Sequence, residues 1–230
     1  RRFKRALAAY PGAGEVEVVF RSYQLDPSTP DEAEPTKAYL ERRFGGAPDA
    51  MLSQVTENAR GEGIEMDWDR ALSVNTFTAH RLLWLAEREY GAAVQAALAE
   101  KLFDAHFSRG GNVADHDLLT ELAVAAGMDE SRVREYLSSG EGTVETRAEL
   151  EQARRIGIQA VPTFVFEGKY AVQGAQSAST FLQTLEQVAS EIAKERASEN
   201  GAASNGQAGA GKSAANGGAD AACEDGSCTV

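Results

Sequence analysis

The sequence predicts an α/β protein in which a small sheet domain is interrupted by a large helical insertion. Strand patterns occur only near the two ends of the folded region, at residues 16–23 and 163–173, and helical patterns fill the interval between them. Strands at both ends with helices between them are typical of a sheet domain that is split in sequence. A chain of 230 residues, 43% of them apolar and 25% charged, is long enough to bury such a core.

The charge and hydropathy of the chain argue against several classes of partner. The formal net charge of −12 gives a surface that repels phosphate backbones and anionic lipid, so we expect no nucleic-acid partner and no membrane partner. No apolar run reaches the ~18–20 residues that span a bilayer. The sequence also lacks a Gly-rich phosphate loop, a nucleophile elbow and an H-E-x-x-H zinc motif.

Residues 1–10 have the pattern of a basic amphipathic helix, which a Pro–Gly pair ends before the strand predicted at residues 16–23. In that strand apolar side chains recur at alternate positions. No N-capping residue precedes the helix, so we expect a fragment of a longer protein. Because a right-handed βαβ unit has a strand on each side of its helix, the first strand of the sheet is expected N-terminal to Arg1.

The helical insertion is predicted over residues 27–157. Helices begin after Asn75–Thr76 and after Asp115, and an acidic, Pro-containing stretch at residues 26–35 is expected as a solvated loop. Trp68 and Trp84 are expected in the core. Left-handed residues at helix ends are predicted at Gly45, Gly61, Gly91, Gly110, Gly127, Gly140 and Gly157.

The C-terminal part of the sheet domain is predicted as a hairpin followed by a helix. Residues 163–166 and 170–173 read as two strands around the turn at 167–169, and a long helix follows over about Ser177–Arg196. Residues 197–222 contain no large apolar side chain, which predicts a flexible tail. The predicted organisation is a sheet domain at residues 1–26 and 158–196, the insertion at 27–157, and the tail at 197–230.

Several segments share a pattern with a known family. They are Arg2–Phe3, Phe20–Leu25, Asn75–Thr76 followed by Ala79–Leu82, and Gly157–Val165. Together they resemble the DsbA-like thioredoxin-fold family, and more closely its FrnE-type branch, which is related to 2-hydroxychromene-2-carboxylate isomerases and kappa-class glutathione transferases. The resemblance implies a thioredoxin fold with a large helical insertion, whose first strand is missing from this chain.

The resemblance also implies roles for individual residues. In this family the proline that matches Pro162 is cis and faces the redox cysteines, and its neighbours, here Val161 and Thr163, bind the substrate backbone. Asn75 and His80 would line the cleft where family substrates bind, although a satisfied histidine near the domain interface is the simpler interpretation of His80. The family's Cys-x-x-Cys falls N-terminal to the first residue, so no residue of this chain is assigned as the nucleophile.

Cys223 and Cys228 form a C-x4-C pair in the tail, for which several interpretations compete. A structural staple would close so short a loop that it contributes only ~2 kcal/mol. Zinc usually takes four ligands where this pair supplies two, so no metal site is predicted. A redox pair and a plain reduced tail remain, and the resemblance favours the redox pair, because some FrnE-type members carry a C-terminal C-x4-C that exchanges with the main active site. Cys223 and Cys228 would then act in catalysis together with Pro162.

The function that the resemblance implies is a thiol–disulfide oxidoreductase or isomerase without a cofactor, whose partners are protein or small thiols and disulfides. One alternative is an enzyme like the glutathione-dependent 2-hydroxychromene-2-carboxylate isomerases, in which a hydroxyl replaces the cysteine and glutathione is required. Another is a non-catalytic peptide-binding or holdase module that uses the cleft beside Pro162. The FrnE-type branch also implies a cytoplasmic protein.

Overall fold

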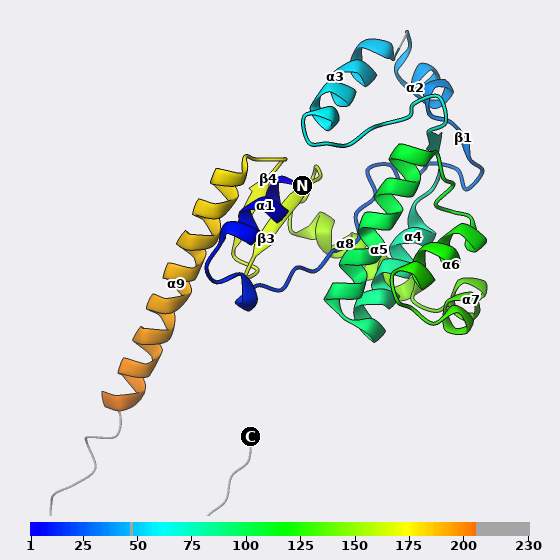
Figure 1. The fold of residues 1–230 in the computed structure, drawn as a ribbon. Helices are drawn as coiled ribbons and strands as arrows, with labels where there is room; N and C mark the ends of the chain where they lie inside the picture. The colour runs from blue at the N-terminus through cyan, green and yellow to red at the C-terminus, as the bar shows by residue number, and fades with distance from the viewer. Residues whose placement is uncertain (47, 206–230) are drawn as a thin grey trace, which may run out of the picture. The chain divides into compact units, whose positions relative to one another are not determined.

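A computed structural model of the protein describes residues 1–46 and 48–205 (Figure 1). The chain forms two compact units, the first spanning Arg1–Leu185 and the second beginning at Glu186. The described residues are mostly helical, and their short strands form two two-stranded sheets. None of the described helices combines the length and the apolar content that crossing a membrane requires.

The chain begins with helix α1, Arg2–Ala9, and a 3-10 turn, η1, Ala13–Glu15. The strand predicted at residues 16–23 is not formed, because these residues run as an extended chain without a strand partner among the described residues (Figure 1). A strand needs a ladder of hydrogen bonds to a neighbouring strand. Here the backbone N–H and C=O of Phe20 bond instead to the side chain of Gln95.

The predicted hairpin is confirmed at both strands. β3, Thr163–Phe166, pairs antiparallel with β4, Tyr170–Gln173, so that Thr163 lies opposite Gln173 and Phe166 lies opposite Tyr170. The turn between them begins with Glu167 and Gly168, whose φ angles of 52° and 66° are left-handed. Helix α9 follows over Ala178–Asn205 and continues past the predicted end at Arg196.

One face of the hairpin is covered by aromatic rings. Phe3 of α1, Phe164 and Phe166 of β3, and Phe181 of α9 pack with ring centroids between 4.6 and 6.4 Å apart. Phe181 is only 1% exposed. Such aromatic pairs contribute ~0.5–1.5 kcal/mol each beyond the burial of area. The rings therefore join the two ends of the Arg1–Leu185 unit to the hairpin.

The main hydrophobic core lies among the helices of the insertion. These are α4, Phe77–Leu85, α5, Ala92–Phe103, α6, His116–Ala125, and α7, Glu130–Ser138, with π-helical turns η2, Ala86–Tyr90, and η3, Asp104–Ser108, on either side of α5. Their completely buried side chains include Leu82, Leu85, Leu98, Leu119, Val133 and Tyr136. Each such side chain contributes ~1.5–3 kcal/mol to stability. Helix α8, Thr143–Arg155, packs against α4.

A buried arginine joins α4 to the end of α7. Arg81 is 7% exposed and donates hydrogen bonds to the backbone carbonyl oxygens of Tyr136, Ser139 and Glu141. The Tyr136 hydroxyl donates in return to the carbonyl oxygen of Arg81 at 2.9 Å. A cation near the C-terminal end of a helix also interacts favourably with the helix dipole.

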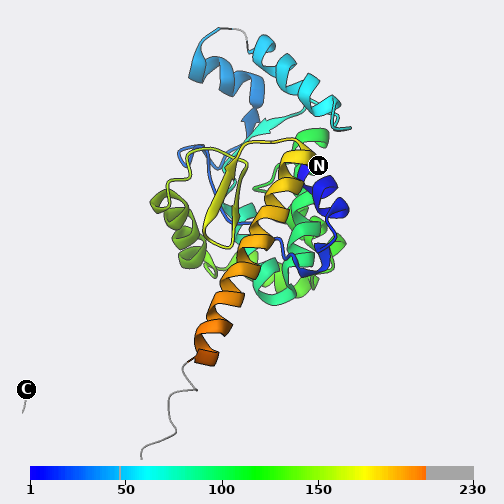
Figure 2. The same cartoon turned by 90° about the vertical axis from the view of Figure 1, so that its left-hand side faces the viewer.

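Two short strands in the insertion were not predicted. β1, Glu34–Pro35, pairs antiparallel with β2, Leu72–Ser73, so the stretch at residues 26–35 is not entirely a loop. Strands of two residues have no periodicity that a sequence pattern could reveal. Helices α2, Thr36–Phe44, and α3, Asp49–Arg60, lie between them in sequence, and Figure 2 shows both next to the β1–β2 pair.

Most predicted helix boundaries are confirmed. The Asp115 side chain caps α6 by accepting a hydrogen bond from the N–H of Leu118 at 2.8 Å. The predicted glycines with left-handed φ are Gly45, Gly91, Gly110, Gly127 and Gly157. The prediction is wrong for Gly61 and Gly140, because the chain makes its left-handed turns two residues later, at Gly63 and Gly142.

Candidate active site

Pro162 precedes β3, and its peptide bond to Val161 is cis, which confirms the conformation predicted for it. The carbonyl oxygen of Pro162 accepts the N–H of Gly174 at 2.7 Å, on the β4 side of the hairpin. Successive residues of an antiparallel strand direct their backbone groups to alternate edges, so Thr163, the first residue of β3, directs its groups away from β4. That edge has no strand neighbour among the described residues.

The side chains around this edge are mainly aliphatic. Val161 and Val165 are 45% and 46% exposed. The Thr163 hydroxyl donates to the carbonyl oxygen of Ala160 at 2.7 Å and therefore holds the loop that carries the cis peptide bond. The loop thus offers an open backbone edge flanked by exposed valines.

Asn75 lies at the N-terminal end of α4, where its carboxamide bonds within the chain. Its Oδ1 accepts hydrogen bonds from the Gln24 side chain at 2.8 Å and from the N–H of Phe77 at 2.9 Å. Its Nδ2 donates to the carbonyl oxygen of Thr29 at 3.0 Å. Asn75 therefore fixes the end of the extended segment, the loop after it and the first turn of α4 relative to one another.

His80 lies one turn further along α4 and contacts the same extended segment. Its imidazole hydrogen-bonds to the backbone of Tyr23, and the Glu149 carboxylate is close enough to interact with it. Burial lowers the pKa of His80 below its ordinary value, while the hydrogen bond to Tyr23 and the charge of Glu149 partly oppose that shift. At neutral pH the imidazole is therefore neutral.

Gln95 is a buried polar residue that sequence reasoning missed. It lies on α5 and is 1% exposed. Its Oε1 accepts the N–H of Phe20 at 2.8 Å, and its Nε2 donates to the carbonyl oxygens of Phe20 at 2.9 Å and of Leu83 at 3.2 Å. The signal that could have revealed it is a single amide among the apolar positions of a buried helix.

Glu149 of α8 holds the next part of the segment. Its Oε2 accepts hydrogen bonds from the N–H of Ser22 at 3.1 Å and from the Ser22 hydroxyl at 2.8 Å, and its Oε1 accepts one from Arg21 at 3.0 Å. Ser22 is only 4% exposed. Side chains from α4, α5 and α8 thus contact one short run of backbone at residues 20–23.

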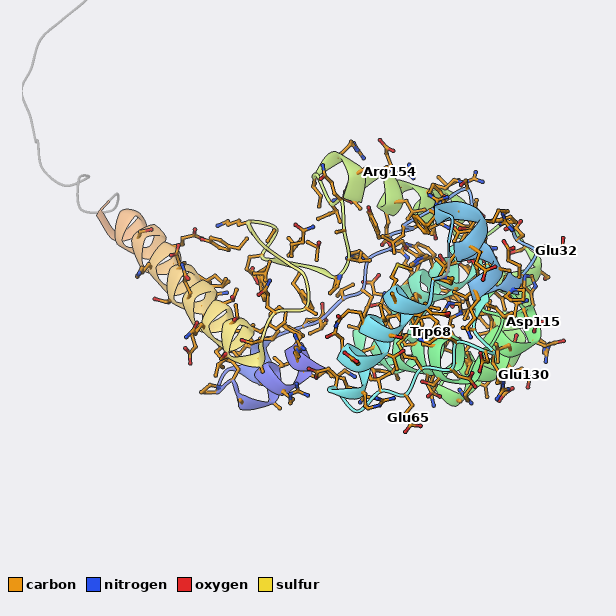
Figure 3. All side chains as sticks on the ribbon, turned by 90° about the horizontal axis from the view of Figure 1, so that it is seen from above. Glu32, Glu65, Trp68, Asp115, Glu130 and Arg154 are labelled. Carbon is orange, nitrogen blue, oxygen red and sulfur yellow. The ribbon has the colours of Figure 1, made fainter. Side chains whose placement is uncertain are left out.

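A separate groove of about 750 Å³ lies between α3 and the chain that follows it. Trp68, predicted as a core residue, is only partly buried and lines this groove, with its indole N–H donating to Thr56 Oγ1 at 2.7 Å. Figure 3 labels Trp68 and Glu65, which also lines the groove. Trp84, by contrast, packs against the main core.

The predicted site residues thus form two groups in the structure. Val161, Pro162 and Thr163 belong to the hairpin, while Asn75 and His80 belong to α4 and contact residues 23–24. Among the described residues, no hydrogen bond joins one group to the other. Cys223 and Cys228, predicted as the redox pair, lie outside the described residues.

Comparisons with known proteins concern the fold and the family. A family model described as DSBA-like thioredoxin domain matches residues 1–186. The crystal structure of a probable DsbA oxidoreductase from Streptomyces coelicolor is similar over 83% of this chain and 82% of that chain, with 34% sequence identity and a TM-score of 0.74. A 2-hydroxychromene-2-carboxylate isomerase matches over 86% of this chain and 92% of that chain, with 16% identity and a TM-score of 0.50, which is a likeness of fold alone. No match was found among curated proteins.

Proposed function

The chain belongs to the DSBA-like thioredoxin domain family, and from this premise we propose that it is part of a FrnE-type thiol–disulfide oxidoreductase acting on protein or small thiols in the cytoplasm. Membership implies a thioredoxin fold with a helical insertion and an activity of the oxidoreductase or isomerase class. The observation that carries the proposal is the backbone edge of β3 at Thr163, which has no strand neighbour in the described part of the chain. The similar structure that is 34% identical is itself described as a probable DsbA oxidoreductase.

The substrate in this proposal binds as an extended segment along the edge of Val161 and Thr163. In such strand addition the main-chain hydrogen bonds supply affinity, and the neighbouring side chains supply specificity. The backbone N–H and C=O of Val161 have no hydrogen-bond partner among the described residues. The exposed Val161 and Val165 side chains favour substrates with apolar residues next to the disulfide.

The exchange itself needs a thiolate beside Pro162. The 230 residues contain only Cys223 and Cys228, and the family resemblance implies a Cys-x-x-Cys pair ahead of the first helix, so we propose that this pair supplies the attacking thiolate in the whole protein. This thiolate attacks the substrate disulfide and releases one substrate sulfur as a thiolate; the second cysteine then attacks the mixed disulfide and releases the other. Two electrons pass from the enzyme dithiol to the substrate, and the enzyme is left as a disulfide.

Cys223 and Cys228 complete the cycle as a relay. Their dithiol reduces the enzyme disulfide through the same two attacks and becomes a disulfide, which an external thiol then reduces. The reverse sequence of steps would oxidise a substrate dithiol. Val161 and Thr163 serve in either direction by holding the substrate backbone, and Pro162 shapes the loop that presents them.

The test uses the complete reading frame, including whatever segment precedes Arg1. Reduction of a disulfide-bonded peptide and of oxidised glutathione is followed with dithiothreitol and, for the peptide, with reduced glutathione as electron donors. Pro162→Ala is expected to raise KM for the peptide several-fold, whereas Pro48→Ala, at the start of α3, should leave it unchanged. Replacing Cys223 and Cys228 by serine should slow turnover with at least one reductant.

Each other outcome assigns a different function. Unchanged turnover of the double cysteine variant with every reductant would remove the relay. Glutathione-dependent isomerisation by a protein with a hydroxyl residue in place of the nucleophilic cysteine would establish the isomerase instead. Suppression of client aggregation by a variant without any cysteine, together with no disulfide turnover by the wild type, would leave a binding module.

A further inference from the structure

In the extended segment at residues 16–25, side chains of the insertion hydrogen-bond to the backbone along only one edge. In an extended chain the backbone groups of Phe20 and Ser22 point to one edge, and those of Val19 and Arg21 point to the other. On the first edge, side chains from the insertion bond to Phe20 and Ser22. The backbone groups of Val19 and Arg21 have no hydrogen-bond partner among the described residues.

Gln95 bonds to Phe20 in the way that a residue of a neighbouring strand would. In an antiparallel ladder two opposed residues exchange both of their backbone hydrogen bonds. The Gln95 carboxamide does the same with one residue, since it accepts from the N–H of Phe20 and donates to its C=O. The second hydrogen of Nε2 goes to Leu83, so both donors and the acceptor of this buried amide are used. Neither a glutamate nor an apolar side chain could make all of these bonds.

Glu149 continues the same edge two residues later. Its Oε2 accepts the Ser22 N–H, and it also accepts the hydroxyl of the same residue. Glu149 lies on α8 and Gln95 on α5, so two separate helices of the insertion reach the same edge. The segment leads from there into Gln24, which bonds to Asn75, and into Leu25, whose side chain is 75% exposed.

We propose that Gln95 and Glu149 are positioning residues whose side chains stand in for a β-strand along one edge of residues 20–22. They restrict strand pairing to the opposite edge and fix the position of Leu25, whose exposed apolar side chain is available to a substrate. The role in substrate binding rests on the proposed function, whereas the replacement of a strand by two side chains does not. The experiment therefore has one readout for each.

The first readout is hydrogen exchange of individual backbone amides in the full chain. The amides of Phe20 and Ser22 are expected to exchange about tenfold more slowly than those of Val19 and Arg21. Gln95→Met should accelerate exchange at Phe20 but not at Ser22, and Glu149→Leu should do the reverse. Glu149→Gln, which keeps an acceptor oxygen, should preserve much of the protection. Gln152→Met and Glu151→Gln, at exposed positions of α8, are the matched controls.

Uniform exchange over residues 19–22 in the wild type, or equal acceleration at Phe20 and Ser22 in both variants, would overturn the inference. If Gln95→Met fails to fold, the exchange rates of residues 19–22 in the wild type and in Glu149→Leu still test the inference. The second readout is turnover of a disulfide peptide by the complete protein. A positioning role raises KM, whereas partial unfolding lowers kcat alone. Normal KM in Gln95→Met with the alternating exchange intact in the wild type would remove the link to substrate and leave the role in the fold.

Discussion

Replacing Arg81 by methionine should destabilise the protein much more than replacing Arg132, although Arg132 makes the more complete set of ion pairs. Arg132 bonds to both carboxylate oxygens of Glu89 and of Glu141, but its side chain is 24% exposed. Exposed ion pairs contribute little, because water and salt screen them. Arg81 is buried and donates hydrogen bonds to the backbone carbonyl oxygens of Ser139 and Glu141.

The magnitude follows from the bonds that Arg81→Met would break. The carbonyl oxygen of Tyr136 keeps the N–H and the hydroxyl of Ser139 as donors, so it is not left unpaired. The carbonyl oxygens of Ser139 and Glu141 lose the donor that Arg81 supplies. A hydrogen bond to a charged group contributes about 1.5–3 kcal/mol. Because Ser139 and Glu141 lie near the surface and water can replace part of the loss, we expect about 2–4 kcal/mol for Arg81→Met, against at most about 1 kcal/mol for Arg132→Met.

The assay is equilibrium urea unfolding of the full chain at pH 7, followed by circular dichroism. The two variants are compared with the wild type in the midpoint and slope of the transition. Equal destabilisation by the two substitutions, or a loss below about 0.5 kcal/mol for Arg81→Met, would refute the argument that the hydrogen bonds of the buried Arg81 contribute more to stability than the ion pairs of Arg132.

Three further predictions use the same unfolding assay. Phe181→Ala should cost about 3–5 kcal/mol, since it removes a fully buried ring, while Val144→Ala, at an exposed position, should change stability by less than about 0.5 kcal/mol. Gly142→Ala should cost at least about 2 kcal/mol, because Gly142 has φ of 72° and a Cβ there would overlap the Tyr136 hydroxyl; a wild-type midpoint would contradict this. Stability should fall as the pH drops below ~6.5, because His80 has a lowered pKa in the fold and takes up its proton more readily when unfolded. His80→Gln should reduce the dependence of the unfolding free energy on pH between pH 7 and 5.5. An unchanged dependence in this variant would contradict the assignment to His80.

The elements that local sequence determines were predicted well. The hairpin follows from alternating residues on both sides of a Gly-containing turn, and its strands lie where the pattern places them. The cap of α6 follows from Asp115 preceding an apolar helix. Such signals need no knowledge of the rest of the chain, because the interacting groups are a few residues apart.

The elements that depend on distant residues were predicted poorly. Residues 16–23 have a strand pattern, but whether they form a sheet depends on a partner, and in the described chain their partners are Gln95 and Glu149. The β1–β2 pair joins residues far apart in sequence and leaves no periodic trace. The cis bond at Pro162 was predicted from the resemblance and not from local pattern, because most X-Pro bonds in proteins are trans.

The aromatic cluster of Phe3, Phe164, Phe166 and Phe181 has a consequence for synthesis on the ribosome. The residues that carry the rings on β3 and α9 are synthesised long after Phe3. Helix α1 can therefore pack against them only when most of the chain has been made. The core of the insertion is complete by the end of α7 and joins helices that are close in sequence, which favours early and rapid folding. We expect the nascent chain to become protease-resistant from its middle outward, with its first helix among the last parts to be protected.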